Sequence, residues 1–311
     1  MEVILAIDGG ATRTRCAAID RSGQTLAQAD GGASNHLLIC EKNVRARLAR
    51  LIQQTLEQAN LRRQDVSCVS AGLAGVDYDG YGAEPMRALF QELEFDRCLV
   101  FGDMEIAHAA ALGGWPGVVV LAGTGSSILG VDTSGRRVKV GGWGPLYGNE
   151  GSAQKISERA LTAAARAYDG RGPSTALLES LTEALGLPDF RNSISLLYGP
   201  EAKDTASLCE VVYRCATSGD AVARSIFDEA ASELAQGVIA TVCQLGIRNS
   251  PVTVSYQGGV TEHCPLLVRS MRERLAETLP DAQVQPPLWK PVMGAYLLAC
   301  KVVGWKAAAQ P

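Results

Sequence analysis

The chain has 311 residues, 47% of them hydrophobic, which suits about two globular domains with buried cores. Its 29 lysine and arginine residues and 33 aspartate and glutamate residues give a net charge of −4, and the basic residues are dispersed. This pattern argues against nucleic acid as a partner. Since no apolar run approaches about 20 residues and the first residues lack an export pattern, we expect a cytoplasmic protein with no membrane partner.

The cysteines and histidines show no pattern typical of disulfides or zinc sites. Nine cysteines is an odd number, their spacings are wide and no CxxC pair occurs, so we expect reduced thiols. The three histidines are scattered along the chain at positions 36, 108 and 263. Histidine-based zinc chemistry is therefore not expected.

The chain begins in the same way twice. Ile19–Gly23 and Val131–Gly135 both read apolar-Asp-x-Ser-Gly, and each follows a turn rich in glycine and hydroxyl residues. The surrounding alternation predicts three short strands in each copy, over 3–7, 15–19 and 25–28 and over 118–122, 128–131 and 137–140. Each half of the protein should therefore open with an antiparallel three-stranded meander.

After each meander the hydrophobic period changes from two to about 3.6. This change predicts helices over 41–60, 84–93, 152–168, 221–245 and 292–306, while apolar runs at 66–71, 98–101 and 252–256 predict buried parallel strands. We expect two α/β lobes, residues 1–116 and 117–291, with a cleft between them. The helix over 292–306 should return to the first lobe and form part of a hinge.

Two glycine-rich turns are candidates for phosphate binding. In Asp8–Thr14, two glycines permit a tight turn whose N–H groups and threonine hydroxyls can face a phosphate, while Asp8 faces a hydrated Mg²⁺. Gly123–Ser127 is the corresponding turn of the second half. Either turn alone is more simply explained as a hairpin turn, but their repetition at equivalent positions favours a nucleotide clamp.

Taken together, the motifs resemble those of the sugar kinase, heat-shock ATPase and actin superfamily. More closely, they resemble the N-acetylglucosamine kinases within the BadF/BadG/BcrA/BcrD ATPase family. The resemblance covers nearly the whole chain and rests on the motifs at 8–14, 71–75, 123–126, 141–144, 148–152, 257–260 and 291–295. It implies a two-lobed α/β fold of the actin-like or ribonuclease H-like ATPase type, with a mixed sheet and helices in each lobe, and a homodimer.

The resemblance also implies which residues bind ATP and Mg²⁺. Asp8 would hold the metal through water, and the phosphates and adenosine would contact Gly9, Gly10, Ala11, Thr12, Thr124, Gly125, Ser126, Gly258 and Gly259. The last two glycines are equally well explained as a strand-to-helix turn.

Five residues are implied as sugar contacts: Asn35, Asp103, Gly142, Trp143 and Asn149. In the resembling kinases an aspartate placed like Asp103, directly after a strand, is the base that accepts the sugar hydroxyl proton. Three of these positions have a simpler alternative. Asp103 could cap a helix over 105–112, Asn35 could be a turn residue, and Trp143 could fill the core.

Position 149 departs from the family pattern, which usually has aspartate there. Asparagine keeps an acceptor but loses the charge-assisted hydrogen bond to a hydroxyl or the ion pair to a free amine, so the identity of the sugar is left open. A further alternative is that Asn149 only caps the helix that begins near Ser152.

The expected reaction is in-line phosphoryl transfer from ATP to an amino sugar, N-acetylglucosamine or glucosamine, with Asp103 as base. Two alternatives stay open within the same family. An ATPase activator of radical dehydratases would need an iron–sulfur cluster, whereas the closest cysteines here, Cys209 and Cys215, are six positions apart. A non-catalytic sugar-sensing protein is the other alternative.

Overall fold

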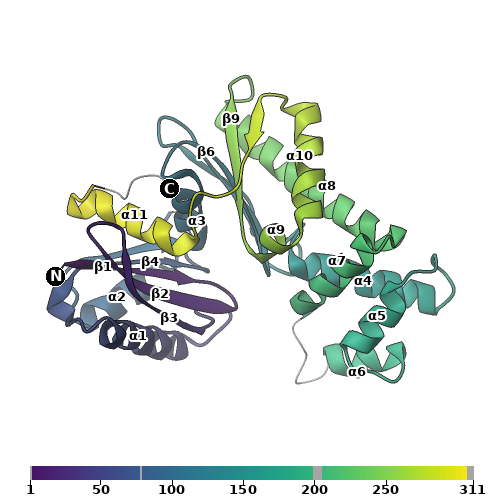
Figure 1. Cartoon of the computed structure of the whole chain (residues 1–311), viewed down its shortest axis with the longest axis horizontal. Helices are drawn as coiled ribbons and strands as arrows, with labels where there is room; N and C mark the ends of the chain where they lie inside the picture. Colours follow the sequence, from purple (N-terminus) through teal and green to yellow (C-terminus); the bar gives the residue numbers. More distant parts are fainter. Residues whose placement is uncertain (1, 78, 199–204, 307–311) are drawn as a thin grey trace. The chain divides into compact units, whose positions relative to one another are not determined.

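The computed structural model describes residues 2–77, 79–198 and 205–306 (Figure 1). The chain divides into two compact units. Unit 1 consists of Met1–Val119 together with Gln285–Pro311, and unit 2 is Val120–Val284. Among the described residues, no helix has both the length and the apolar character needed to cross a membrane.

Unit 1 is built on a five-stranded mixed sheet with the strand order β3-β2-β1-β4-β5. Strand β1 pairs with β2, and β2 with β3, in antiparallel fashion, whereas β4 runs parallel to both of its neighbours, β1 and β5. The strands are β1 (Val3–Gly9), β2 (Arg13–Asp20), β3 (Thr25–Gly32), β4 (Val66–Leu73) and β5 (Cys98–Gly102). The meander and the two buried parallel strands expected from the sequence are therefore present.

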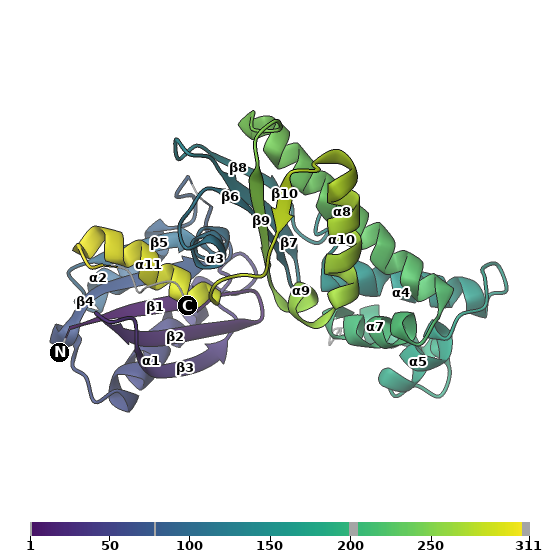
Figure 2. The same cartoon turned by 45° about the horizontal axis from the view of Figure 1, so that its top comes forward.

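Helices cover both faces of this sheet, as Figure 2 shows. Because side chains alternate along a strand, Leu5 and Ile7 of β1 pack toward one helical layer while Ile4 and Ala6 pack toward the other. The first layer contains α1 (Glu41–Gln58) and α2 (Glu84–Glu92), with a single 3₁₀ turn (Arg63–Asp65) before β4. The second contains α3 (Asp103–Leu112) and α11 (Pro291–Val303).

Helix α11 packs closely on α3 and on the sheet of unit 1. The Ser70 hydroxyl on β4 donates a 2.7 Å hydrogen bond to the carbonyl of Ala295. At the helix crossing, a Cβ atom on Gly294 would lie 1.8 Å from the carbonyl oxygen of Ile106, so only glycine fits. A hinge function of α11 stays a prediction.

Unit 2 repeats the sheet plan, with the strand order β10-β9-β6-β7-β8. Its strands are β6 (Gly117–Ala122), β7 (Ser126–Val131), β8 (Arg137–Gly141), β9 (Val252–Gln257) and the short β10 (Ala282–Val284). Its helices are α4 (Ala153–Tyr168), α5 (Leu177–Ala184), α6 (Ser193–Tyr198), α7 (Cys209–Thr217), α8 (Ala221–Leu245), α9 (Gly259–His263) and α10 (Pro265–Thr278), with 3₁₀ turns at Phe190–Asn192 and Thr205–Leu208. The helices between α4 and α8 and strand β10 were not expected from the sequence.

The duplicated start of the chain is visible down to single hydrogen bonds. The carboxylate of Asp20 accepts from the N–H and hydroxyl of Ser22, at 2.8 and 2.6 Å, and from the N–H of Gln24, at 3.0 Å. Asp132 accepts from Ser134 and Arg136 in the same way, at 2.8, 2.7 and 3.0 Å. One local turn chemistry thus joins the second and third strands of both meanders.

Candidate functional site

The turn between β1 and β2 carries the first predicted phosphate motif. Its ends are joined by a 2.9 Å hydrogen bond from the N–H of Gly10 to the carbonyl of Arg13, and residues 11–13 between them are exposed. A Cβ atom on Gly9 would lie 2.3 Å from the Ser34 hydroxyl and 2.5 Å from the Leu73 side chain. Glycine at position 9 therefore lets the turn pack tightly on its neighbours while its tip stays accessible.

Asp8 lies at the end of β1, on the face of the sheet that α3 covers. Its cross-strand neighbour Arg15 forms a 3.2 Å ion pair with Asp30, so these three side chains form one row across the sheet. Burial, and next to it the negative charge of Asp103, raises the pKa of Asp8 to about 6, although Arg15 lowers it. The two carboxylates are therefore close enough to repel each other.

This pair of carboxylates fits a magnesium ion. Mg²⁺ prefers oxygen ligands, and in phosphate-transferring sites it is commonly held by one or two carboxylates together with waters and substrate phosphates. Within the described ranges there is no cluster of three or more histidine, cysteine, aspartate or glutamate side chains suited to a metal. Asp8 is thus suited to hold such a metal through water, beside the carboxylate of Asp103.

Asp103 is the first residue of α3 and not its N-cap. The N-cap is Gly102, whose N–H donates a 2.9 Å hydrogen bond to the Glu105 carboxylate, and the Asp103 carboxylate accepts a 2.8 Å bond from the N–H of Met104. The capping alternative for Asp103 is therefore wrong, because Gly102 and Glu105 carry out that function. Asp103 instead presents a carboxylate at the carboxyl end of β5.

The loop after β3 brings Asn35 to the same end of the sheet. The N–H of Ser34 donates a 3.1 Å hydrogen bond to the carbonyl of Gly10, which ties this loop to the β1–β2 turn. The Asn35 side-chain oxygen accepts a 2.9 Å bond from the N–H of Leu37, and a Cβ on Gly75 would lie 2.8 Å from that oxygen. Asn35 is thus a turn residue in a loop that contacts the phosphate motif.

In unit 2, the turn between β6 and β7 carries the second phosphate motif. It closes by a 2.9 Å hydrogen bond from the N–H of Gly123 to the carbonyl of Gly125. The first helical residues of α4 donate to the turn: Ala153 N–H to the Gly123 carbonyl at 2.9 Å, and Gln154 N–H to the Thr124 carbonyl at 3.4 Å. The start of α4 therefore holds this turn in place.

The glycine pair after β9 packs against the same turn. Gly258 has a φ of 106°, and a Cβ on it would lie 2.5 Å from the carbonyl oxygen of Ala122. Gly258 is also the N-cap of the short helix α9, so the strand-to-helix turn considered for it exists. The structure thus brings Gly258, Gly259 and the turn at 123–126 together within unit 2.

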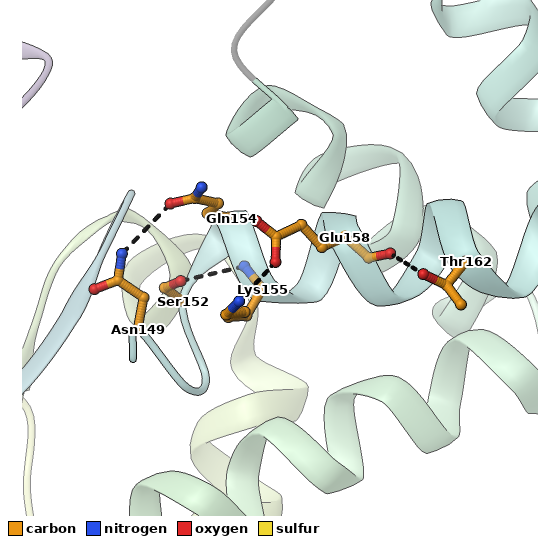
Figure 3. Close-up of polar contacts among 6 residues, drawn as sticks. All are labelled: Asn149, Ser152, Gln154, Lys155, Glu158 and Thr162. Carbon is orange, nitrogen blue, oxygen red and sulfur yellow. Dashed lines mark hydrogen bonds and ion pairs between the residues drawn. The ribbon is translucent and has the colours of Figure 1, made fainter. Parts of the chain in front are cut away.

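Asn149 does not cap α4. The N-cap is Ser152, whose hydroxyl accepts a 3.3 Å hydrogen bond from the N–H of Lys155 (Figure 3). The Asn149 amide instead accepts from the N–H of Ser126 and donates to the Gln154 side chain, both at 3.4 Å. The capping alternative is therefore wrong, and Asn149 belongs to the surroundings of the β6–β7 turn.

Trp143 is 66% exposed, so the core-filling alternative is wrong for it. It stacks on Tyr147, with ring centroids 6.4 Å apart and an interplanar angle of 28°. The neighbouring Gly142 has a φ of 74°, and a Cβ there would lie 2.9 Å from the Ser127 hydroxyl. The result is an accessible aromatic surface, to which Tyr147, which the sequence reasoning missed, also contributes.

A pocket of about 470 Å³ opens beside this loop in unit 2. Its lining includes Tyr147, Glu150, Lys155 and Glu233. None of the residues expected to bind ATP, metal or sugar lines it. Sequence reasoning gave no sign of this pocket, because α4 and α8 contribute its walls only after they pack.

Comparisons with known proteins match the chain to an ATPase family and to sugar kinases. A model of the BadF/BadG/BcrA/BcrD ATPase family matches residues 5–299. An N-acetylmuramic acid/N-acetylglucosamine kinase of Clostridium acetobutylicum is 30% identical over 302 residues, which are 96% of this chain and 98% of the relative. An N-acetyl-D-glucosamine kinase of Dictyostelium discoideum is 29% identical over the same shares of the two chains.

Solved structures share the fold. A protein from Chromobacterium violaceum, assigned provisionally as an N-acetylglucosamine kinase, aligns with a TM-score of 0.77 at 24% identity, covering 96% of this chain and 98% of the other. A ROK family glucokinase from Streptomyces griseus, in complex with glucose and AMPPNP, aligns with a TM-score of 0.63 at 15% identity over the same shares. The fold class expected from the sequence is thereby confirmed.

Proposed function

The chain belongs to the BadF/BadG/BcrA/BcrD ATPase family, and we propose that it is an ATP-dependent kinase that phosphorylates a hydroxyl of an amino sugar. The curated relatives that cover nearly its whole length are kinases of N-acetylglucosamine, one of them also of N-acetylmuramic acid. The observation that carries the proposal is the pair Asp8 and Asp103 in unit 1, two interacting carboxylates beside a glycine turn.

Asp103 is the proposed base. Its carboxylate would accept the proton of the attacking sugar hydroxyl as the oxygen–phosphorus bond forms and the bond to the leaving ADP oxygen breaks. Asp103 is well suited to this because it is the first residue of α3. The Glu105 carboxylate, and not that of Asp103, accepts the hydrogen bond from the N–H of the N-cap residue Gly102. Its orientation therefore does not depend on its serving as a cap.

Asp8 would hold Mg²⁺ through water, and Gly9, Gly10, Ala11 and Thr12 would contact phosphate with their backbone and hydroxyl donors. When bound, Mg²⁺ offsets the negative charge of the transferred phosphoryl group. In unit 2, phosphate contacts are proposed for the N–H groups and hydroxyls of Thr124, Gly125 and Ser126, and adenosine contacts for Gly258 and Gly259.

The proposed substrate is N-acetylglucosamine or glucosamine. Asn35, Gly142 and Trp143 are the proposed sugar contacts in addition to Asp103, and the exposed Trp143–Tyr147 stack supports a flat apolar surface for a pyranose ring. A homodimer also belongs to the proposal and rests on the family resemblance alone.

The test is ADP release measured over a panel of hexoses and amino sugars, with and without Mg²⁺. We expect sugar-dependent and metal-dependent turnover, highest with N-acetylglucosamine or glucosamine. ADP release that does not depend on any sugar would favour the ATPase-activator alternative. Nucleotide or sugar binding without turnover would favour the sugar-sensing alternative.

Asp103→Asn tests the base. The amide can still accept the hydrogen bond from Met104, so stability should barely change, while turnover should fall by about 10²- to 10⁴-fold because the proton acceptor is lost. Asp96→Asn, at an exposed position of the same unit, is the matched control. Normal turnover in a well-folded Asp103→Asn protein would remove Asp103 as the base.

A further inference from the structure

The β6–β7 turn is held with its carbonyls toward α4. Gly123 and Thr124 both direct their carbonyl oxygens to N–H groups at the start of that helix. In a trans peptide the N–H points opposite to the carbonyl of the same unit, and no cis bond occurs in the described chain. The N–H groups of Thr124 and Gly125 therefore both point away from α4. Two consecutive donors aimed in one direction are the arrangement that binds a phosphate oxygen.

Asn149 completes this arrangement. Its side-chain oxygen accepts the N–H of Ser126, the next donor along the turn, and its NH₂ group donates to the Gln154 side chain. A second bond, 2.6 Å from the Ser126 hydroxyl to the carbonyl of Glu150, ties the same residue to the same loop. The amide of Asn149 thus links the turn to the first turn of α4 (Figure 3 shows the Gln154 end of this link).

The local backbone is built for this contact. Asn149 is 8% exposed and has a φ of 63°, a conformation that asparagine tolerates better than most residues. A Cβ on Gly125 would lie 3.0 Å from the Asn149 side-chain oxygen, so glycine at 125 lets the turn approach the amide. Both partners are therefore matched in shape as well as in hydrogen bonding.

We propose that Asn149 is a positioning residue for the nucleotide, and not primarily a sugar ligand. Its amide keeps the β6–β7 turn in the conformation whose N–H groups face the phosphates of ATP, which rests on the function proposed above. An amide is suited to this place because it supplies both an acceptor for the Ser126 N–H and a donor for the Gln154 side chain.

Asn149→Gly is the variant that isolates the amide. Glycine adopts the positive φ of this position freely, so the backbone is not strained, and only the two side-chain hydrogen bonds are lost. Asn60→Gly is the matched control, because Asn60 is an exposed asparagine with a φ of 54° in unit 1. Gln154→Ala removes one of the two bonds and tests the other end of the link.

The primary measurement is equilibrium binding of a non-hydrolysable ATP analogue with Mg²⁺ and no sugar, by calorimetry. We expect about tenfold weaker binding for Asn149→Gly, a smaller loss for Gln154→Ala and no change for Asn60→Gly. In steady-state kinetics the KM for ATP should rise while the KM for the sugar stays within about twofold. Thermal melting verifies that each variant is folded.

Asn149→Asp separates positioning from sugar contact. A carboxylate can accept from the Ser126 N–H, and from the Gln154 amide if that amide turns over, so both links are kept. Nucleotide binding should therefore stay close to that of the wild type, and the ratio of kcat/KM for glucosamine and N-acetylglucosamine should stay unchanged. A raised KM for sugar or a changed sugar ratio, with unchanged nucleotide binding, would overturn the inference.

The failure of this inference can be told from the failure of the proposed function. If the wild-type protein binds the ATP analogue but phosphorylates no sugar, the kinase proposal fails, and the binding comparison between variants still decides the function of Asn149. If Asn149→Gly binds the analogue as tightly as the wild type, the positioning inference fails even in an active kinase. A wild-type protein that does not bind the analogue would overturn both.

Discussion

Replacing Asp8 by asparagine should make unit 1 more stable at neutral pH while abolishing metal-dependent activity. Folding raises the pKa of Asp8 from its ordinary value of 3.8 to about 6, chiefly through burial and next through the charge of Asp103. At 1.36 kcal/mol for each pKa unit, this difference corresponds to a destabilisation of about 3 kcal/mol when the carboxyl is ionised. Asparagine at position 8 carries no charge and should therefore recover most of that free energy.

The pH dependence follows from proton binding. Between pH 3.8 and about 6 the native state holds the Asp8 proton while the unfolded state has released it, so the stability of the wild type falls as the pH rises through this window. Above this pH window the ionised Asp8 destabilises the wild type by the full amount, and below the window the destabilisation is absent. The advantage of Asp8→Asn should therefore be about 3 kcal/mol at pH 7.5 and near zero at pH 3.5.

Urea unfolding without Mg²⁺, followed by tryptophan fluorescence, measures this effect. Three of the four tryptophans, Trp115, Trp289 and Trp305, belong to unit 1, so the signal reports mainly on that unit. Adding Mg²⁺ with the ATP analogue at pH 7.5 should stabilise the wild type more than the variant. A stability difference that is equal at both pH values would refute the electrostatic reasoning, and a destabilised variant at pH 7.5 would refute the assignment of Asp8 as a costly buried charge.

Two further substitutions test the packing around α3. Gly294→Ala would place a methyl group 1.8 Å from the Ile106 carbonyl, so unit 1 should lose about 3 kcal/mol or more in urea unfolding, whereas Gly32→Ala, with no atom nearer than 3.5 Å, should change little. Glu105→Ala removes the acceptor for the Gly102 N–H, and we expect unit 1 to lose about 1 kcal/mol of unfolding free energy and kcat to fall about tenfold. Glu105→Gln should largely restore both. An unchanged kcat in Glu105→Ala would show that Asp103 does not depend on this cap.

Features set by neighbouring residues were predictable from the sequence. The Asp-x-Ser-Gly turns predicted a repeated meander because Asp20 and Asp132 each bind donors two and four residues ahead, which any copy of the motif reproduces. Helix α8 was predicted with both its ends, since Asp220 caps its start and Gly246 ends it. The family motifs then gave the fold and the class of reaction.

Features set by contacts between distant segments were not predictable. Asn149 was expected to touch sugar or to cap a helix, but its partner Ser126 lies 23 positions earlier, and only the folded sheet brings them together. Strand β10 was missed because three residues are too few to show an alternation. The capping alternative for Asp103 was wrong because the N-cap is the preceding residue, Gly102. A glutamate three positions after an N-cap is typical of a capping box, so Glu105 could have indicated Gly102 as the cap.

The packing of α11 into unit 1 has a consequence for how the protein is made. Unit 2 is a continuous segment, so it can complete its sheet as soon as residue 284 has left the ribosome. Unit 1 cannot, because one face of its sheet, with Ile4 and Ala6, is covered by α3 alone until Pro291–Val303 is synthesised. The unit that is translated first is thus completed last, and during synthesis its exposed apolar face is a place for chaperones to bind.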